Sequence, residues 1–171
     1  SSPAVINSHA GEEQWSRLQP IHSHTQLVKH DFLVGSLPDF DPEKHKCSYP
    51  RIKRMASGEY ILFCMPTSHG TSIFYTISPD LKTWSEPVLL LETYRTVVAD
   101  KEVQIRYVNM DAAVLPNGDL LGVCQFWCRE HYRAQLGTGI VTLRSSDNGK
   151  TWTSPQVIYE GSNWEPYLLV L

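Results

Sequence analysis

The octapeptide Ser145-Ser-Asp-Asn-Gly-Lys-Thr-Trp152 decides the fold that we expect for this chain. Asp147 can accept hydrogen bonds from the backbone of its own turn, and the Asn-Gly pair that follows it tolerates positive φ. Trp152 supplies a large apolar anchor beneath the turn. The flanking residues 139–144 and 156–159 have the composition of strands. The stretch therefore predicts a tight, internally supported turn between the two strands of a hairpin.

Length and composition are those of an ordinary globular domain. The chain has 171 residues, 42% of them hydrophobic and 19% charged, with a formal net charge of -3. This is enough for one domain with a sizeable core, and the charge does not favour a nucleic-acid partner. No apolar run approaches the roughly 18 residues that cross a bilayer, so we expect no membrane span. The chain begins at Ser1 without a signal peptide, which we interpret as a mature or trimmed form.

Neither the cysteines nor the histidines predict a metal site or another cofactor. The cysteine spacings match no metal framework, and we favour buried thiols over a disulfide, leaving the redox compartment open. Three histidines lie close together, but no carboxylate is spaced to complete a site with them, which favours a solvated strand edge. These residues are Cys47, Cys64, Cys124, Cys128, His22, His24 and His30.

The sequence around the octapeptide has an earlier copy about 60 residues before it. Residues 51–64 align with residues 111–124, and residues 78–87 align with residues 145–155. In the second pair the earlier copy is one residue shorter and lacks the glycine. The alignment places Gly58 on Gly118, Glu59 on Asp119, Cys64 on Cys124, Trp84 on Trp152 and Pro87 on Pro155.

Each copy predicts four antiparallel strands, which together are one blade of a β-propeller. The expected strands are residues 50–55, 59–65, 71–77 and 84–91, then 110–115, 119–126, 138–144 and 152–159. Two blades cannot close a ring, and an open edge would remain unpaired. We therefore interpret the chain as the N-terminal part of a longer protein that does not fold well alone.

The predicted organisation is part of a single β-propeller domain. In order along the chain, we expect a tail or loop at 1–20, a ring-closing outer strand and loop at 21–48, a blade at 49–92, a blade with the octapeptide turn at 107–160, and the first strand of the next blade at 163–171.

The pattern S-x-D-x-G-x-T-W at residues 145–152 resembles the Asp-box, or bacterial neuraminidase repeat, of the sialidase-like β-propellers. In that family the motif supports a peripheral hairpin away from the active site. The resemblance implies an all-β, six-bladed propeller, of which this chain covers about two blades and the start of a third. It also implies an exo-acting glycoside hydrolase, an exo-α-sialidase with a carbohydrate substrate, and we expect a secreted or periplasmic protein.

Three ionisable residues occupy one position in successive repeats. Arg51 lies seven residues before Gly58, Asp111 lies seven before Gly118, and Glu165 has the equivalent place in Trp-Glu-Pro. First strands of blades line the central channel, where ionisable groups can shift one another's pKa for acid–base work. We assign Arg51 to substrate binding, Asp111 to acid–base or positioning work, and Glu165 to a catalytic carboxylate or the activator of a nucleophile. A salt bridge for Arg51 and a capping role for Asp111 are the structural alternatives.

The segment Tyr49-Pro-Arg-Ile52 is similar to the Arg-Ile motif near the start of sialidases, whose arginine grips the substrate carboxylate. Sialidases have Arg-Ile-Pro, whereas the proline here precedes the arginine. The remaining arginines and the tyrosine nucleophile of that family would lie beyond residue 171. Further candidates for substrate contact are Tyr49, Arg54, Arg106, Trp127, Tyr132 and Trp164. For Trp127 a core role has equal weight.

Two other functions fit the same pattern. Exo-arabinanases with a six-bladed sialidase-like propeller use two glutamates, of which Glu165 would be one. Asp-boxes also occur in propellers that bind glycans or proteins without catalysis, and fold alone does not fix function.

Overall fold

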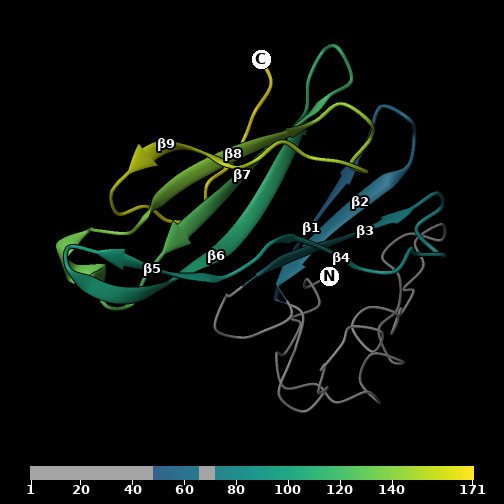
Figure 1. The fold of residues 1–171 in the computed structure, drawn as a ribbon. Helices are drawn as coiled ribbons and strands as arrows, with labels where there is room; N and C mark the ends of the chain where they lie inside the picture. The colour runs from purple at the N-terminus through teal and green to yellow at the C-terminus, as the bar shows by residue number, and fades with distance from the viewer. Residues whose placement is uncertain (1–47, 66–71) are drawn as a thin grey trace, which may run out of the picture. The chain divides into compact units, whose positions relative to one another are not determined.

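The computed structural model describes residues 48–65 and 72–171, and in these ranges the chain is all-β (Figure 1). Two antiparallel sheets form, each made of strands that follow one another along the chain. A single turn of 3-10 helix, Tyr132–Ala134, lies between two strands of the second sheet. The predictions for residues 1–20 and 21–47 lie outside the described residues.

The first sheet has the order β1-β2-β3-β4 and confirms the four strands predicted for the earlier copy. Its strands are β1 (Ser48–Arg54), β2 (Tyr60–Met65), β3 (Ile73–Ser78) and β4 (Val88–Leu91). The last strand begins at Val88 instead of residue 84. Ser85 contacts the end of β3 through its side chain, because its Oγ accepts the backbone N–H of Ile77 at 2.9 Å. Pro87 then offers no N–H for pairing.

The second sheet has the order β5-β6-β7-β8-β9 and is one strand larger than predicted. Its strands are β5 (Tyr94–Val98), β6 (Lys101–Val114), β7 (Leu120–Trp127), β8 (Gly139–Ser145) and β9 (Gln156–Glu160). β5 and the first half of β6 were not predicted from the sequence. Ala99 (φ 48°) and Asp100 (φ 60°) join them with two consecutive left-handed residues. Such hairpin turns are usually signalled by Asn-Gly or Asp-Gly, which is absent here.

Near the C-terminal end one predicted strand boundary is wrong. Residues 163–171, predicted as the first strand of a next blade, pair with no strand among the described residues, and their extended backbone is interrupted at Glu165, which has a φ of 46° and precedes Pro166. β9 begins at Gln156 instead of residue 152. Residues 152–155 finish the turn instead, and the indole Nε1 of Trp152 donates to the Gly149 carbonyl at 3.0 Å.

The octapeptide turn is built as predicted. Asp147 Oδ1 accepts the backbone N–H of Thr151 at 2.8 Å, and its Oδ2 accepts the Thr151 hydroxyl at 2.6 Å. Ser145 Oγ donates to Asp147 at 2.9 Å and accepts the N–H of Gly149 at 2.9 Å. Asn148 and Gly149 have φ values of 54° and 80°. The turn therefore uses the conformations that an Asn-Gly pair tolerates.

The earlier copy has a similar hydrogen-bond network although it lacks the glycine. Asp80 Oδ1 accepts the backbone N–H groups of Lys82 and Thr83, each at 2.8 Å, and the Thr83 hydroxyl at 3.1 Å. Ser78 Oγ accepts the N–H of Leu81 at 2.8 Å. The Ser-x-Asp pattern is thus the part of the motif that both repeats share, and the structural repeat is confirmed at the level of individual bonds.

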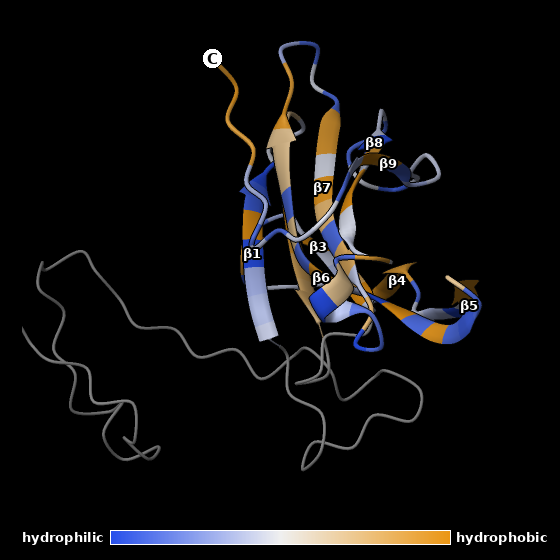
Figure 2. Ribbon diagram, turned by 90° about the vertical axis from the view of Figure 1, so that its left-hand side faces the viewer, coloured by the Kyte–Doolittle hydropathy of each residue, from blue (hydrophilic) through white to orange (hydrophobic). Residues whose placement is uncertain are grey.

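One apolar core joins the two sheets. Trp152, which follows the octapeptide turn, lies edge-on to Phe63 and Tyr75 of the first sheet, with centroid distances of 5.9 and 6.4 Å. The Tyr75 hydroxyl donates to the Lys150 carbonyl at 3.3 Å. In Figure 2, apolar residues concentrate on β3, β6 and β7, whereas β1 is mostly hydrophilic. The arrangement is propeller-like, with the octapeptide turn of the second sheet packed against the first sheet.

The cysteines within the described ranges are packing residues. Cys124 and Cys128 are buried free thiols, as predicted, and Cys64 is buried as well. Burial raises the pKa of the Cys124 thiol far above its ordinary value, and its Sγ donates to the Val108 carbonyl at 3.1 Å. A thiol kept protonated in this way is a poor nucleophile. Cys47 lies outside the described residues, as do the three histidines.

Candidate functional site

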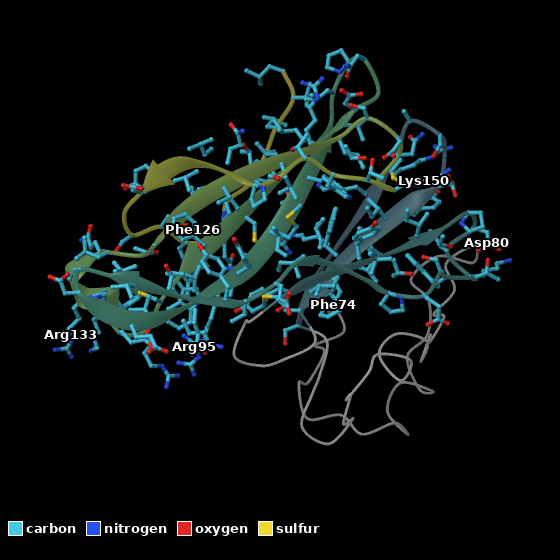
Figure 3. All side chains as sticks on the ribbon, viewed as in Figure 1. Phe74, Asp80, Arg95, Phe126, Arg133 and Lys150 are labelled. Carbon is cyan, nitrogen blue, oxygen red and sulfur yellow. The ribbon has the colours of Figure 1, made fainter. Side chains whose placement is uncertain are left out.

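An open cleft of about 750 Å³ lies beside the C-terminal half of β7. β1, the end of β2, the middle of β6, the loop after β7 and the segment after β9 all contribute to its wall. The residues that line it are Tyr49, Met65, Val108, Asn109, Gln125, Trp127, Arg129, Glu130, His131, Tyr132, Arg133, Ala134 and Trp164. In Figure 3, Arg133 lies at the opposite end of the ribbon from Asp80 and Lys150. The two Ser-x-Asp turns are therefore remote from this end of the second sheet.

Four aromatic residues line the cleft: Tyr49, Trp127, Tyr132 and Trp164. Trp127 and Tyr132 meet edge to face, with centroids 6.2 Å apart and an interplanar angle of 79°. Trp164 is 70% exposed, and Tyr49 is 50% exposed. Large aromatic rings left open to solvent around a concave surface are typical of a binding site, not of a core.

Trp127 is held in place by Arg106. The two residues are direct cross-strand partners on β6 and β7, and the Arg106 guanidinium carbon lies 5.5 Å from the ring centroid. Arg106 Nη2 also donates to Gln104 Oε1 at 2.8 Å. This cation–π contact restrains the indole, since both side chains project from the same face of the sheet. Arg106 is absent from the cleft lining, so its observed role is to support a lining residue.

Two oxygen atoms in the cleft wall are buried without a hydrogen-bond partner, Asn109 Oδ1 and Glu130 Oε2. Leaving a buried acceptor unsatisfied costs about 1–3 kcal/mol, so such atoms are uncommon in folded proteins. Asn109 also has a φ of 57° and lies where the β6–β7 register shifts, between Val108 and Asp111. Bulges and left-handed non-glycine residues often occur at functional sites.

Glu130 is ionised at neutral pH. The backbone N–H of Glu130 itself lowers the pKa of this carboxyl group, and the positive charge of Arg106 adds to the effect. The residues that line the cleft also include two exposed arginines, Arg129 and Arg133. In the described part of the chain, no carboxylate forms an ion pair with either of them.

Gln125 connects the second sheet to the segment that contains Trp164. Its side chain is buried, and its Nε2 donates to the Asn163 carbonyl at 2.9 Å. Asn163 Nδ2 donates in turn to the Gly161 carbonyl at 3.0 Å. These bonds restrain the backbone next to Trp164, although the segment belongs to no sheet.

The structure brings together only the aromatic part of the predicted site. Tyr49, Trp127, Tyr132 and Trp164 all line the cleft, whereas Arg51, Arg54, Arg106, Asp111 and Glu165 do not. Arg51 and Arg54 are exposed on β1, and Glu165 is exposed next to Trp164 in the chain.

Asp111 is 2% exposed, and its Oδ1 lies 3.2 Å from Lys53 Nζ. The pair is close enough for an ion pair but is not aligned as a hydrogen bond, because Oδ1 has no hydrogen-bond partner. The contact links β1 of the first sheet to β6 of the second. Asp111 therefore has a charged partner inside the protein, which is a structural role different from the capping role expected as its alternative.

Asn109 and Glu130 were not among the site residues predicted from the sequence. Asn109 had a usable signal, because an asparagine inside a strand-like run is a residue that tolerates left-handed backbone. Glu130 belongs to the charged run Arg129-Glu-His-Tyr-Arg133, which directly follows the strand ending at Trp127. Its position in a shared cleft depends on the fold and could not be read from the local sequence.

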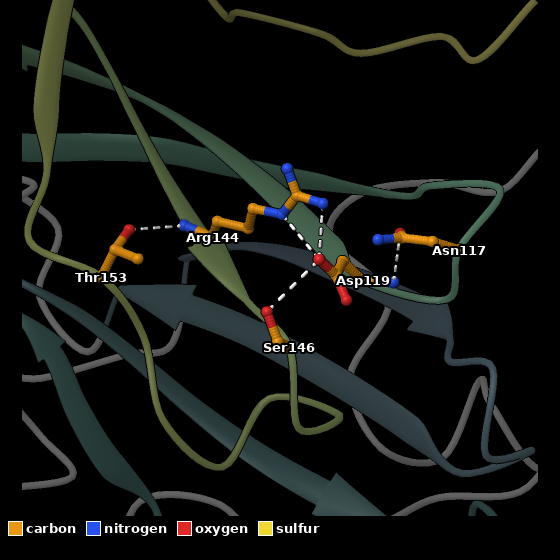
Figure 4. Close-up of polar contacts among 5 residues, drawn as sticks. All are labelled: Asn117, Asp119, Arg144, Ser146 and Thr153. Carbon is orange, nitrogen blue, oxygen red and sulfur yellow. Dashed lines mark hydrogen bonds and ion pairs between the residues drawn. The ribbon is translucent and has the colours of Figure 1, made fainter.

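Asp119 and Arg144 form a second polar cluster, which supports the turns (Figure 4). Arg144 Nε donates to Asp119 Oδ2 at 2.7 Å, and Ser146 Oγ donates to the same oxygen at 3.3 Å. The Arg144 backbone N–H is bonded to Thr153 Oγ1 at 2.9 Å. The hydrogen bond from Arg144 lowers the pKa of the Asp119 carboxyl group. The acidic position that the repeat alignment singled out thus has a structural partner.

Within residues 48–65 and 72–171, no group of three or more His, Cys, Asp or Glu residues is arranged to hold a metal ion. In the same ranges, no helix is long and apolar enough to cross a membrane.

No protein-family model matches the chain, and no curated protein matches it either. A crystal structure of a protein of unknown function from Dyadobacter fermentans is similar, with a TM-score of 0.50 and 21% identity over 68% of this chain. A ulvan lyase, a polysaccharide lyase, gives TM-scores of 0.48 with its saccharide bound and 0.49 in a second structure, at 16% and 15% identity over 66% of this chain. The matches cover 37% of the first protein and 28% of the lyase. At these identities, the likeness that reaches a TM-score of 0.50 bears on the fold alone.

Proposed function

We propose that this chain is part of a carbohydrate-active β-propeller, and that the cleft around Trp127 and Trp164 binds the terminal residue of a glycan. The observation that carries the proposal is that four aromatic residues line one open cleft together with amide, acidic and arginine residues. A sugar ring has apolar C–H faces that pack on aromatic rings and hydroxyl edges that need hydrogen-bond partners.

The finer proposal is an exo-acting, sialidase-like hydrolase with a six-bladed propeller. It is supported by the repeated Ser-x-Asp turns and by the place of Glu165 directly after a cleft residue. Arg129 and Arg133, without a carboxylate partner in the described ranges, suit the carboxylate of an acidic sugar. In this proposal Glu165 is the catalytic carboxylate or the activator of a nucleophile.

A second candidate is a propeller that binds glycans without cleaving them. Glu130 is the one carboxylate among the residues that line the cleft in the described part of the chain. Most glycosidases require a pair of carboxylates across the scissile bond. The arabinanase-like alternative needs two catalytic glutamates and is tested by the same experiment.

The test is an assay of the intact protein with p-nitrophenyl α-sialosides and α-L-arabinofuranosides, measuring turnover and equilibrium binding. Trp164→Ala should weaken binding by about tenfold, since it removes a stacking surface. Tyr167→Ala is the matched control, because Tyr167 is 71% exposed but does not line the cleft. Glu165→Gln should lower turnover by orders of magnitude while the protein stays folded.

Each outcome separates the alternatives. Sialoside turnover supports the sialidase-like hydrolase, and arabinoside turnover supports the two-glutamate enzyme. Binding without turnover identifies the non-catalytic propeller. Binding that Trp164→Ala and Tyr167→Ala affect equally, or no binding of either glycoside, would overturn the proposal that this cleft is the saccharide site.

A further inference from the structure

We propose that Asn109 and Glu130 are the residues that determine saccharide specificity in the cleft, and that their unpartnered oxygens accept hydrogen bonds from two sugar hydroxyl groups. This inference rests on the proposed function of the cleft and adds to it the polar groups that recognise the sugar.

The two oxygens come from separate elements and meet in one wall. Asn109 belongs to the bulge in β6, and Glu130 belongs to the loop that follows β7. Both residues line the cleft, and Asn109 Oδ1 and Glu130 Oε2 are buried with no hydrogen-bond partner. A carboxylate and an amide carbonyl can only accept, so the matching ligand must donate. Neighbouring hydroxyl groups on a sugar ring provide two such donors.

The backbone holds Asn109 in a conformation that asparagine tolerates and most residues do not. Its φ of 57° lies in the left-handed region, at the point where two residues of β6 lie opposite one residue of β7. A bulge redirects the side chain from the regular alternation of the strand. The bulge therefore has a consequence for recognition, because it places the amide of Asn109 in the wall of the cleft.

The charges of the cleft favour hydroxyl groups over a cation as the donor. Arg129 and Arg133 line the same cleft, and Arg106 lies close enough to influence the Glu130 carboxyl group. These guanidinium groups repel a metal ion or an ammonium group. In the described part of the chain, no third acidic, histidine or cysteine ligand accompanies Glu130 in a metal-binding arrangement.

The experiment compares Asn109→Gly and Glu130→Gln with wild type, in the intact protein and with the same sialoside and arabinoside. Glycine keeps the left-handed backbone of residue 109 and removes the amide, whereas glutamine keeps the shape of Glu130 and replaces one acceptor with a donor. Each variant should bind the probe that wild type binds about tenfold more weakly or worse. Asn148→Gly is the matched control, because Asn148 has a φ of 54° in a turn outside the cleft, and its affinity should equal that of wild type.

Thermal unfolding separates recognition from a structural role. Asn109 Oδ1 and Glu130 Oε2 have no partner inside the protein, and Glu130→Gln keeps a side-chain oxygen that can accept the backbone N–H groups bonded to this carboxylate. Both variants should therefore melt within about 3 °C of wild type. A large loss of thermal stability with unchanged affinity would overturn the inference. Loss of binding when EDTA is added would also overturn it, in favour of a metal site.

Failure of the inference is distinguishable from failure of the proposed function. If wild type binds a probe and the affinity of both variants for it is within twofold of the wild-type affinity, Asn109 and Glu130 do not determine saccharide specificity. The assignment of the cleft as the saccharide site then stands. If wild type binds neither probe, the saccharide site itself is wrong, and this inference is wrong with it.

Discussion

A single carboxylate organises each of the two Ser-x-Asp turns. Asp147 and Asp80 both accept hydrogen bonds from the backbone and hydroxyl of a threonine, Thr151 and Thr83. This is the residue-level feature that the sequence predicted best, because every partner lies within four positions of the aspartate. Local hydrogen bonds of this kind depend on spacing and hardly at all on the rest of the fold.

The two aspartates should give the protein a measurable acid sensitivity. Bonds from Thr151 lower the pKa of Asp147 to about 2, and bonds from the backbone of Thr83 and Lys82 lower the pKa of Asp80 to about 2. A carboxyl group whose pKa is lower in the folded state stabilises the protein above its unfolded pKa, near 3.8. That stability is lost as the pH falls from about 4 to about 2.

We therefore predict that Asp80→Asn and Asp147→Asn destabilise the protein at pH 7 and flatten its stability profile between about pH 4 and 2. Urea unfolding at a series of pH values measures this. Glu59→Gln is the control, because Glu59 lies in a different turn, and it should leave the slope unchanged. An equally steep profile in the aspartate variants would show that other groups control the acid transition.

At the scale of elements, the position of β8 between β7 and β9 depends on a residue without a side chain. A Cβ built on Gly139 would collide with the backbone oxygen of Tyr159 on β9 and lie 2.7 Å from the Phe126 ring on β7. Gly139 pairs with both neighbours, opposite Phe126 on one side and Glu160 on the other. β8 therefore starts where the backbones of three strands, β7, β8 and β9, approach closely.

Gly139→Ala should destabilise the protein by about 1–3 kcal/mol, the usual cost of overpacking, and loosen the pairing of β9. Gly58→Ala is the comparison, because a Cβ there meets nothing within 4 Å and is opposed only by a φ of 88°. Its cost should be about 1–2 kcal/mol from backbone strain alone. Denaturant unfolding gives both values, and hydrogen exchange should show faster exchange in β9 only for Gly139→Ala. Equal protection of β9 in the two variants would contradict this account.

At the scale of the whole molecule, the sequence could predict the sheets but not the cleft. The repeat, the Gly turns and the alternating strands specify local pairing, and they gave both sheets except for β5 and the first half of β6. The cleft gathers side chains from five separate segments, so its composition depends on how the sheets pack. Aromatic residues such as Trp127 could be proposed individually, whereas the joint position of Asn109 and Glu130 emerges only from the fold.

The three ionisable residues at one repeat position, Arg51, Asp111 and Glu165, also show what the sequence alone could not predict. The repeat alignment correctly placed Asp111 on a strand equivalent to β1, but it could not show that Lys53 lies 3.2 Å away on the neighbouring sheet. Equivalent positions in two repeats need not face a shared central channel, because the contacts of each side chain depend on the residues around it. A buried carboxylate with an internal partner is first of all part of the packing between sheets.

The last prediction decides which role Asp111 has. Lys53→Met removes the ammonium group and leaves a carboxylate that is 2% exposed without its partner. Since the Lys53 side chain is 32% exposed, the loss should be about 1–3 kcal/mol, below the range for fully buried pairs. Asp111→Asn in the Lys53→Met background should recover part of that loss, because the uncompensated charge is gone.

A double-mutant cycle measured by urea unfolding gives the coupling between the two residues. Coupling of about 0.5 kcal/mol or more, together with nearly unchanged probe binding and turnover in Asp111→Asn, would establish Asp111 as a residue that joins the two sheets. Coupling near zero with turnover lowered by orders of magnitude would instead support the acid–base role predicted from the repeat, and the reacting atoms would then have to lie beside β6 and outside the aromatic cleft. Measurements on Lys53 and Asp111 thus decide both whether this pair stabilises the packing of the two sheets and whether catalysis takes place beside β6.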